Sequence, residues 1–302
     1  MRLDDYDKDI KVRDLGRGKG GFGGGGGGGL AMLLNFLPLL LGRKLGCGTV
    51  LLIAAAGAFF MYSNGGLGFL GGSSGEQTAT AGSSNADEVC TLDPMRKEVC
   101  DTLSSLDNTW ERLFQQNGAR YRTPTLSFFT DRNRSGCGAA QSAMGPFYCP
   151  ADEGIYIDTS FFNDLERRTG AGGDFARSYV IAHEVGHHIQ KLEGTADQVR
   201  QMQARSSKAD GNALQVRMEL QADCYAGVWA GLNANRIEPG DLEEGMRAAN
   251  AIGDDTIMKS AGRRPVPESF THGTSQQRMT WLRKGLQTRD PSQCNTFQTN
   301  RL

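Results

Sequence analysis

An uncharged run of eighteen residues, Leu45–Tyr62, divides this chain into parts that must fold separately. At 1.5 Å per residue, a helix of this length just crosses the hydrocarbon core of a bilayer. The run begins too far along the chain to be a secretory signal peptide, so it predicts one uncleaved transmembrane helix within an apolar segment over residues 30–62. Arg43 and Lys44 precede it and predict a cytoplasmic N-terminal side. A buried core helix is the alternative.

The segments on either side of this run have compositions typical of unfolded chain. Residues 1–29 are charged at first and then rich in glycine, with seven consecutive glycines at positions 23–29. Such a segment buries too little apolar surface to offset its backbone entropy, so we predict a disordered cytoplasmic tail. Residues 63–88 are rich in Gly, Ser, Thr and Ala and predict a flexible linker. The folded domain is therefore expected over residues 89–297.

The overall charge excludes one large class of function. The 33 basic side chains nearly balance the 34 acidic ones, so the chain has no broad basic face for nucleic acid. A hydrophobic content of 38% allows no more than one or two membrane spans. The expected partners are therefore a bilayer, through one span, and whatever the folded domain binds.

Cysteine positions fit a folded domain outside the cytoplasm. Six of the seven cysteines follow the apolar run, where an oxidising compartment would allow disulfides. Closeness in the sequence suggests two pairs and leaves a third: Cys90–Cys100, Cys137–Cys149 and Cys224–Cys294. Reduced thiols in the cytoplasm are the alternative.

Local signals predict an α+β domain dominated by helices, with one small sheet. Strands are expected at 125–129 and, as a hairpin, at 145–149 and 154–158. Asp93-Pro94 is typical of a helix start. The expected helices run from there to about Leu106, around Trp110–Gln116, from Asp174 to a stop at Gly194, over 210–235, and from two capping boxes, Asp241–Glu244 and Thr274–Gln277.

The sequence His183-Glu184-Val-Gly-His187 lies inside the helix that Asp174 begins. Its two histidines are one turn apart, so both imidazoles project from the same face and can reach one Zn²⁺. Glu184 lies about 100° round the helix. From there it cannot join as an equal ligand, but it can accept a proton from a water molecule on the metal. Two histidines and a glutamate so placed predict a metal-assisted hydrolase.

A catalytic zinc usually has three protein ligands and one open position. Glu219 is the best third ligand, because it lies on the second long helix with Asp223 one turn later. Asp223 is expected to accept the free N–H of a ligand histidine and to fix its tautomer. Ala226, Gly227 and Ala230 follow on the same face, and we expect them to let this helix approach the first closely.

The other two histidines receive different predictions. His188 points about 100° away from His187, so it is expected on the helix face or behind the ligands rather than on the metal. His272 precedes the last helix, in a loop that can lean over a cleft. It is a candidate donor to the oxyanion that forms during hydrolysis, with Arg278 as the second candidate. A structural histidine at a helix entry is the alternative for His272.

Several blocks of the sequence resemble one known family. They are Gly145–Pro150, Ala182–His188, Glu219–Cys224, Gly240–Gly245, Ala251–Asp255 and Thr271–Ser275. With the glycine-rich start and the single apolar run, they are similar to the neutral zinc metallopeptidase family of bacteria, a membrane-anchored group of the zincin class. The resemblance implies a zincin-like fold, His183, His187 and Glu219 as ligands, and Glu184 as the base. It also implies an edge strand that pairs with the substrate backbone, which would be Ile155–Asp158 here.

Together these features predict a membrane-anchored endopeptidase with one Zn²⁺ per chain, acting on proteins or peptides. The expected location is the bacterial inner membrane, single-pass, with the catalytic domain on the periplasmic side. Two alternatives remain open. One is a catalytically silent zinc-binding scaffold, and the other is a non-peptidase metallohydrolase acting on an ester or a cell-wall amide.

Overall fold

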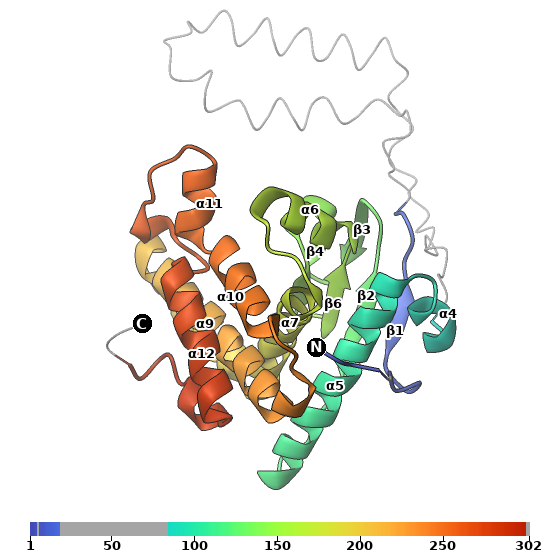
Figure 1. The fold of residues 1–302 in the computed structure, drawn as a ribbon. Helices are drawn as coiled ribbons and strands as arrows, with labels where there is room; N and C mark the ends of the chain where they lie inside the picture. Colours follow the sequence, from blue (N-terminus) through green and yellow to red (C-terminus); the bar gives the residue numbers. More distant parts are fainter. Residues whose placement is uncertain (5, 19–83, 300–302) are drawn as a thin grey trace, which may run out of the picture. The chain divides into compact units, whose positions relative to one another are not determined.

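The computed structural model describes residues 1–4, 6–18 and 84–299 (Figure 1). The transmembrane helix expected at 45–62 lies outside these residues, as do the glycine run and most of the predicted linker. A search of the described helices for one with the length and apolar character of a membrane span finds none.

The described residues form two sheets rather than the expected one. The larger sheet has the strand order β1-β2-β6-β5. Its strand β2 pairs in parallel with both β1 and β6, whereas β5 and β6 are antiparallel and form the predicted hairpin. The strand bounds are β1 Val12–Asp14, β2 Thr125–Phe128, β5 Phe147–Cys149 and β6 Gly154–Ile157. The second sheet is a separate hairpin of β3 Arg132–Ser135 and β4 Gly138–Gln141.

Strand β1 belongs to the segment that was expected to be disordered, and that prediction is wrong for the described part of residues 1–18. Val12 is buried, and the backbone of Leu15 donates to the Phe128 carbonyl at 2.8 Å. Arg96 also pairs with the Asp14 carboxylate at 2.8 Å. Composition missed this segment because its partners lie more than 80 residues away in the sequence.

The position of β1 also bears on the expected membrane arrangement. Pairing with β2 puts residues 12–14 beside residues 126–128, and therefore on the same side of any membrane. A single crossing between residues 18 and 84 would separate the two strands. Since the predicted span lies outside the described residues, the single-pass arrangement with a cytoplasmic N-terminal side stays a prediction.

The helices mostly follow the expected positions. Pro94–Gln116 is one continuous helix, α5, where two were expected. The long helices of the predicted site are α7 Asp174–Leu192 and α9 Lys208–Leu232, and α12 Ser275–Thr288 follows later. The shorter α-helices are α4 Ala86–Cys90, α6 Ser160–Thr169, α8 Thr195–Gln203, α10 Asp241–Ala251 and α11 Asp254–Ser260. Short 3-10 turns include η1 Ser142–Met144 and η4 Pro291–Cys294.

Two of the expected helix starts form as predicted and two do not. The Asp93 side chain caps α5, and Thr274 and Gln277 form the capping box of α12. The box expected at Asp241 is absent, because Gly240 occupies the cap position and the Asp241 carboxylate accepts from the backbone of Glu238 instead. Asp174 is the first residue of α7 rather than its cap, which is Gly173.

Helix α7 lies at the centre of the domain and contacts β5, α5, α9 and α10 (Figure 1). Its Gly186 lets α9 approach closely, because a Cβ there would lie 2.9 Å from the Ala222 Cα. Gly227, which was expected to serve this purpose, instead faces α12, where a Cβ would lie 2.1 Å from the Leu282 carbonyl oxygen. Small residues therefore bring α9 close to α7 and to α12.

All three predicted disulfides are confirmed. Cys90–Cys100 joins α4 to α5, Cys137–Cys149 joins the turn of the β3–β4 hairpin to the end of β5, and Cys224–Cys294 joins α9 to η4.

Candidate metal centre

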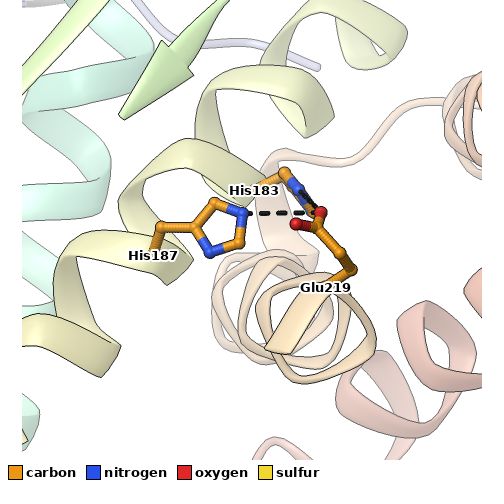
Figure 2. A group of neighbouring side chains, drawn as sticks. All are labelled: His183, His187 and Glu219. Atoms are coloured by element: carbon orange, nitrogen blue, oxygen red, sulfur yellow. Dashed lines mark hydrogen bonds and ion pairs between the residues drawn. The ribbon is translucent and has the colours of Figure 1, made fainter. Parts of the chain in front are cut away.

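The structure brings His183, His187 and Glu219 together between α7 and α9 (Figure 2). Both histidines project from α7, one turn apart, and Glu219 projects toward them from α9. One ligand atom from each residue lies within 4.8 Å of the other two. The Glu219 Oε2 atom is 3.1 Å from His183 Nε2 and 3.5 Å from His187 Nε2. Two ligand atoms on a tetrahedral zinc are about 3.3 Å apart, so these spacings suit one ion.

The hydrogen bonds behind the histidines show which ring nitrogens are free for a metal. His183 Nδ1–H donates to Asp223 Oδ1 at 2.8 Å, and His187 Nδ1–H donates to Gln190 Oε1 at 2.9 Å. Each neutral ring therefore turns the lone pair of its Nε2 atom toward the Glu219 carboxylate. Lone pairs facing each other at this distance need a cation or a proton between them, so the donor set fits Zn²⁺.

Asp223 lies where the sequence predicted it, and Arg278 holds it there. The fully buried Arg278 guanidinium donates through Nε to Asp223 Oδ2 at 2.9 Å and through Nη2 to Oδ1 at 2.8 Å. Tyr179 also donates its hydroxyl to Oδ1, at 2.7 Å. These bonds commit Arg278 to Asp223, so the structure favours an orienting role for Arg278 over the oxyanion-donor role considered from the sequence.

Two glutamines complete the surroundings of the ligands, and sequence reasoning missed both. Gln190 is fully buried and anchors its amide nitrogen on the Met218 carbonyl at 2.7 Å while it accepts from His187. Gln215 donates to Glu219 Oε1 at 2.8 Å, which leaves Oε2 to face the histidines. Their spacing was a usable signal, since Gln190 follows His187 by three residues and Gln215 precedes Glu219 by four.

Charge interactions shift the pKa values of these groups strongly. Burial alone would lower the pKa of His183, but the Asp223 charge and the bonds to Asp223 and Glu219 raise it to about 9. Burial would raise the pKa of Glu219, but His187 and His183 hold it well below its usual range. Asp223 likewise keeps a lowered pKa despite burial, because Arg278 and His183 lie beside it. The site is therefore arranged to hold positive charge.

Glu184 is buried at the wall of the same cleft, next to the ligand cluster. Burial is the main cause that raises the pKa of its carboxyl, and the two ligand histidines oppose it. The backbone N–H of Tyr148, in the middle of β5, lies near this carboxylate and also opposes the rise of its pKa. A carboxylate with a raised pKa, held beside a metal site, can take up and release a proton.

His272 lines the same cleft from the loop before α12. Its Nδ1 lies 3.2 Å from Asp254 Oδ1, and this bond is the main cause that raises its pKa. Asp254 Oδ2 accepts three successive backbone N–H groups, those of Thr271, His272 and Gly273, at 2.7–3.0 Å. Asp254 thus fixes both the loop and the ring, and the imidazole edge remains half exposed toward the cleft.

His188 lies away from the ligands, as expected, and points toward the sheet. It is fully buried, and burial lowers its pKa. One of its ring nitrogens contacts the Arg122 carbonyl and the other contacts the Tyr148 hydroxyl.

The cleft has a volume of about 590 Å³ and is mostly apolar around the polar centre. Strand β5 is an edge of the sheet and borders this cleft. The sequence predicted Ile155–Asp158 as the edge strand that pairs with substrate, and that prediction is wrong. These residues belong to β6 and its end, and β6 is hydrogen-bonded on both sides, by β2 and by β5. The apolar residues of the cleft wall include Met144, Phe147, Phe161, Val180, Ile252 and Ile257.

A second group of carboxylates, Asp174, Asp241 and Glu244, lies near the start of α7. The Met1 ammonium contacts two of them, Asp174 at 2.7 Å and Asp241 at 2.9 Å. This group therefore already has a cationic partner.

Comparisons with known proteins agree with this geometry. Residues 1–297 match the family model described as "Putative neutral zinc metallopeptidase". Uncharacterized protein YpfJ of Escherichia coli strain K12 is 50% identical over 224 residues, which cover 74% of this chain and 76% of that protein. Uncharacterized protein Rv2575 of Mycobacterium tuberculosis strain H37Rv is 41% identical over 212 residues, 66% of this chain and 69% of that protein. No solved structure matches the chain.

Proposed function

The chain belongs to the neutral zinc metallopeptidase family, and from this premise we propose that it is a zinc-dependent endopeptidase with Glu184 as general base. One observation carries the proposal. His183, His187 and Glu219 converge on one point beside a cleft, and their remaining polar atoms are held by Asp223, Gln190 and Gln215. Three protein ligands suit a catalytic zinc, whereas structural zinc sites normally have four.

Zinc in this site would supply Lewis-acid chemistry, lowering the pKa of a water molecule and polarising the scissile carbonyl. The side chains of the chain supply the rest. Glu184 takes the proton of the attacking water and delivers it to the leaving amine. His272, protonated and held by Asp254, donates Nε2–H to the oxyanion of the substrate. Strand β5 offers its free edge to an extended peptide, in place of the strand predicted from the sequence.

The test compares Glu184→Gln with the wild-type full chain in detergent. We expect the variant to bind one zinc per chain, measured by mass spectrometry, and to digest a peptide library about 10²–10⁴-fold more slowly than wild type. Chelation should abolish wild-type digestion. Glu193→Gln is the control, because Glu193 is the C-cap residue of the same helix but bonds Tyr225 outside this cleft.

Each other outcome points to a different function. Wild-type digestion rates in Glu184→Gln would reject Glu184 as the base. A wild-type chain that binds zinc but cleaves neither peptides nor esters would be a scaffold. Cleavage of esters or amides without cleavage of peptides would indicate a non-peptidase metallohydrolase.

We also propose that the domain lies outside the cytoplasm, anchored by the apolar segment over residues 30–62. Three disulfides support an oxidising compartment. Pairing of β1 with β2 requires residues 1–18 to lie on the same side as the domain. Cysteines introduced separately at the exposed positions Lys8 and Arg263 should then react equally with a membrane-impermeant maleimide on intact spheroplasts. Labelling of only one would reject this arrangement.

A further inference from the structure

His188 follows the ligand His187 directly but faces the opposite partner, the sheet. Its Nε2 lies 2.5 Å from the Arg122 carbonyl oxygen, which can only accept a hydrogen bond. Nε2 therefore carries the proton, and Nδ1 is left as an acceptor. The Tyr148 hydroxyl, 3.0 Å from Nδ1, must then be the donor. Both ring nitrogens are occupied, which excludes His188 as a metal ligand in this arrangement.

Aromatic contacts hold this imidazole from two sides. The Tyr148 ring meets it edge-on with centroids 5.4 Å apart, and the Tyr121 ring does so at 5.9 Å. With no exposed surface and two directional hydrogen bonds, the ring has a single orientation. It therefore gives Tyr148 a fixed point on α7.

Tyr148 connects this fixed point to the candidate base. Its side chain bonds His188, while its own backbone N–H lies near the Glu184 carboxylate, and both residues line the same cleft. It lies in the middle of β5, which is a sheet edge and contacts α7. The next residue, Cys149, is tied to Cys137. Strand β5 is thus held at its end by a disulfide and at its centre by the Tyr148–His188 bond.

We propose that His188 is a positioning residue for catalysis: through Tyr148 it fixes the segment of β5 that lies beside the Glu184 carboxylate. The proposal rests on the proposed function, in which Glu184 is the base. In this arrangement α7 positions its base in two ways. Glu184 is itself a residue of α7, and His188, one turn later, holds the strand that lies beside the Glu184 carboxylate.

The test uses Tyr148→Phe, which removes only the hydroxyl, and His188→Gln, singly and together in the full chain. We expect each single variant to bind zinc as wild type does, to keep KM for a peptide substrate, and to lose roughly tenfold in kcat. The double variant should lose no more than the single ones, because both changes break the same connection.

Tyr225→Phe is the matched control. It also removes a buried tyrosine hydroxyl bond, to Glu193 at 2.8 Å, but on α9 and outside the cleft. A similar fall in melting temperature with unchanged kcat is expected for it. If Tyr148→Phe behaves like this control, with kcat retained, the role of His188 is merely structural and the proposal is overturned.

The outcomes separate this proposal from the proposed function. A wild-type chain that digests no peptide would overturn both. A digesting wild type with an equally fast Tyr148→Phe would overturn only the role of His188. If His188→Gln does not fold, Tyr148→Phe still decides, together with the ¹⁵N spectrum of the His188 imidazole. That spectrum should report the Nε2–H tautomer in the wild type, and the Nδ1–H tautomer would contradict the proposal.

Discussion

Two adjacent residues of α7, His187 and His188, lie in surroundings of opposite character. The His187 side of the helix faces α9, where the Glu219 carboxylate faces the two ligand histidines and Asp223 pairs with Arg278 of α12. The His188 side faces the sheet, where the contacts are a tyrosine hydroxyl, a backbone carbonyl and two aromatic rings. A rotation of about 100° round α7 therefore separates a charged metal side from a neutral strand side.

The comparison shows how a single helix can serve both a metal and a substrate. Buried charges are stable only when they are paired or bind metal, and the bidentate Arg278–Asp223 pair meets that condition behind His183. The contacts around His188 are uncharged and need no counter-charge. They can therefore fix β5 without changing the electrostatic potential at Glu184. Glu184 lies between the two sides and receives an influence from each.

Removing a charge from the metal side should have the largest effect. In Glu219→Gln the two imidazoles lose their anionic partner, and a neutral amide is a poor zinc ligand. We expect zinc affinity to fall by more than the 10–100-fold typical of residues that only orient a ligand, and digestion to disappear with it. Competition titration against a chromophoric chelator measures this. Wild-type affinity in the variant would remove Glu219 from the ligand set.

His272 extends the charged side to the loop over the cleft. As an oxyanion donor it should be worth about 10²–10³-fold in kcat, so His272→Ala should lose that much while zinc content stays constant. The donor is the protonated ring, whose pKa Asp254 raises, so activity that depends on it is lost as pH rises through that pKa. The pH profile of kcat should lose this alkaline limb in His272→Ala. An unchanged profile would assign the limb to another group.

Local spacing was enough to predict the charged side, because its key residues follow helical repeats. His183, Glu184 and His187 are neighbours on one helix, and Glu219 and Asp223 are one turn apart on another. The strand side could not be predicted in the same way. Its geometry depends on which strand takes the sheet edge, and β5 rather than β6 does so because β2 pairs with β6 across the sheet.

The two largest errors have the same physical cause. The sequence made Arg278 a second candidate for the oxyanion donor, and only the packing of α12 against α9 brings it to Asp223. Residues 12–14 look like part of a polar tail, and only the distant strand β2 gives them a ladder of hydrogen bonds. Contacts between segments far apart in the sequence leave no periodic pattern in either segment.

Asp107 bonds Tyr121, whose ring contacts His188, so it tests whether the strand side also stays uncharged farther from the metal. Its carboxyl accepts from the Tyr121 hydroxyl at 2.5 Å, and its Oδ2 has no hydrogen-bond partner among the described residues. Burial raises its pKa to about 7, although the bond from Tyr121 opposes this. The folded chain therefore keeps a proton that the unfolded chain loses near pH 4, and stability falls as pH rises toward 7.

Urea unfolding at several pH values measures this effect. Between pH 5 and pH 8 the wild type should lose roughly 2–3 kcal/mol of unfolding free energy relative to Asp107→Asn, whose side chain does not ionise. The same substitution at the half-exposed Asp164 serves as the control. Parallel pH profiles for wild type and Asp107→Asn would mean that Asp107 is charged when folded, and the strand side would not be neutral.

The smallest expected effect concerns Gln190, the neutral partner of His187. His183 is oriented by the charged Asp223, whereas His187 is oriented by the amide of Gln190. If charge on the metal side contributes to zinc affinity only through the ligands and Asp223, loss of the neutral Gln190 should have a small effect. Gln190→Leu should then lower zinc affinity by about tenfold, the lower end for an orienting residue. Gln221→Leu is the control, because it removes a partner of Gln190 without touching His187. A loss as large as that of Glu219→Gln would show that the tautomer of His187, and not charge, governs binding on this side of α7.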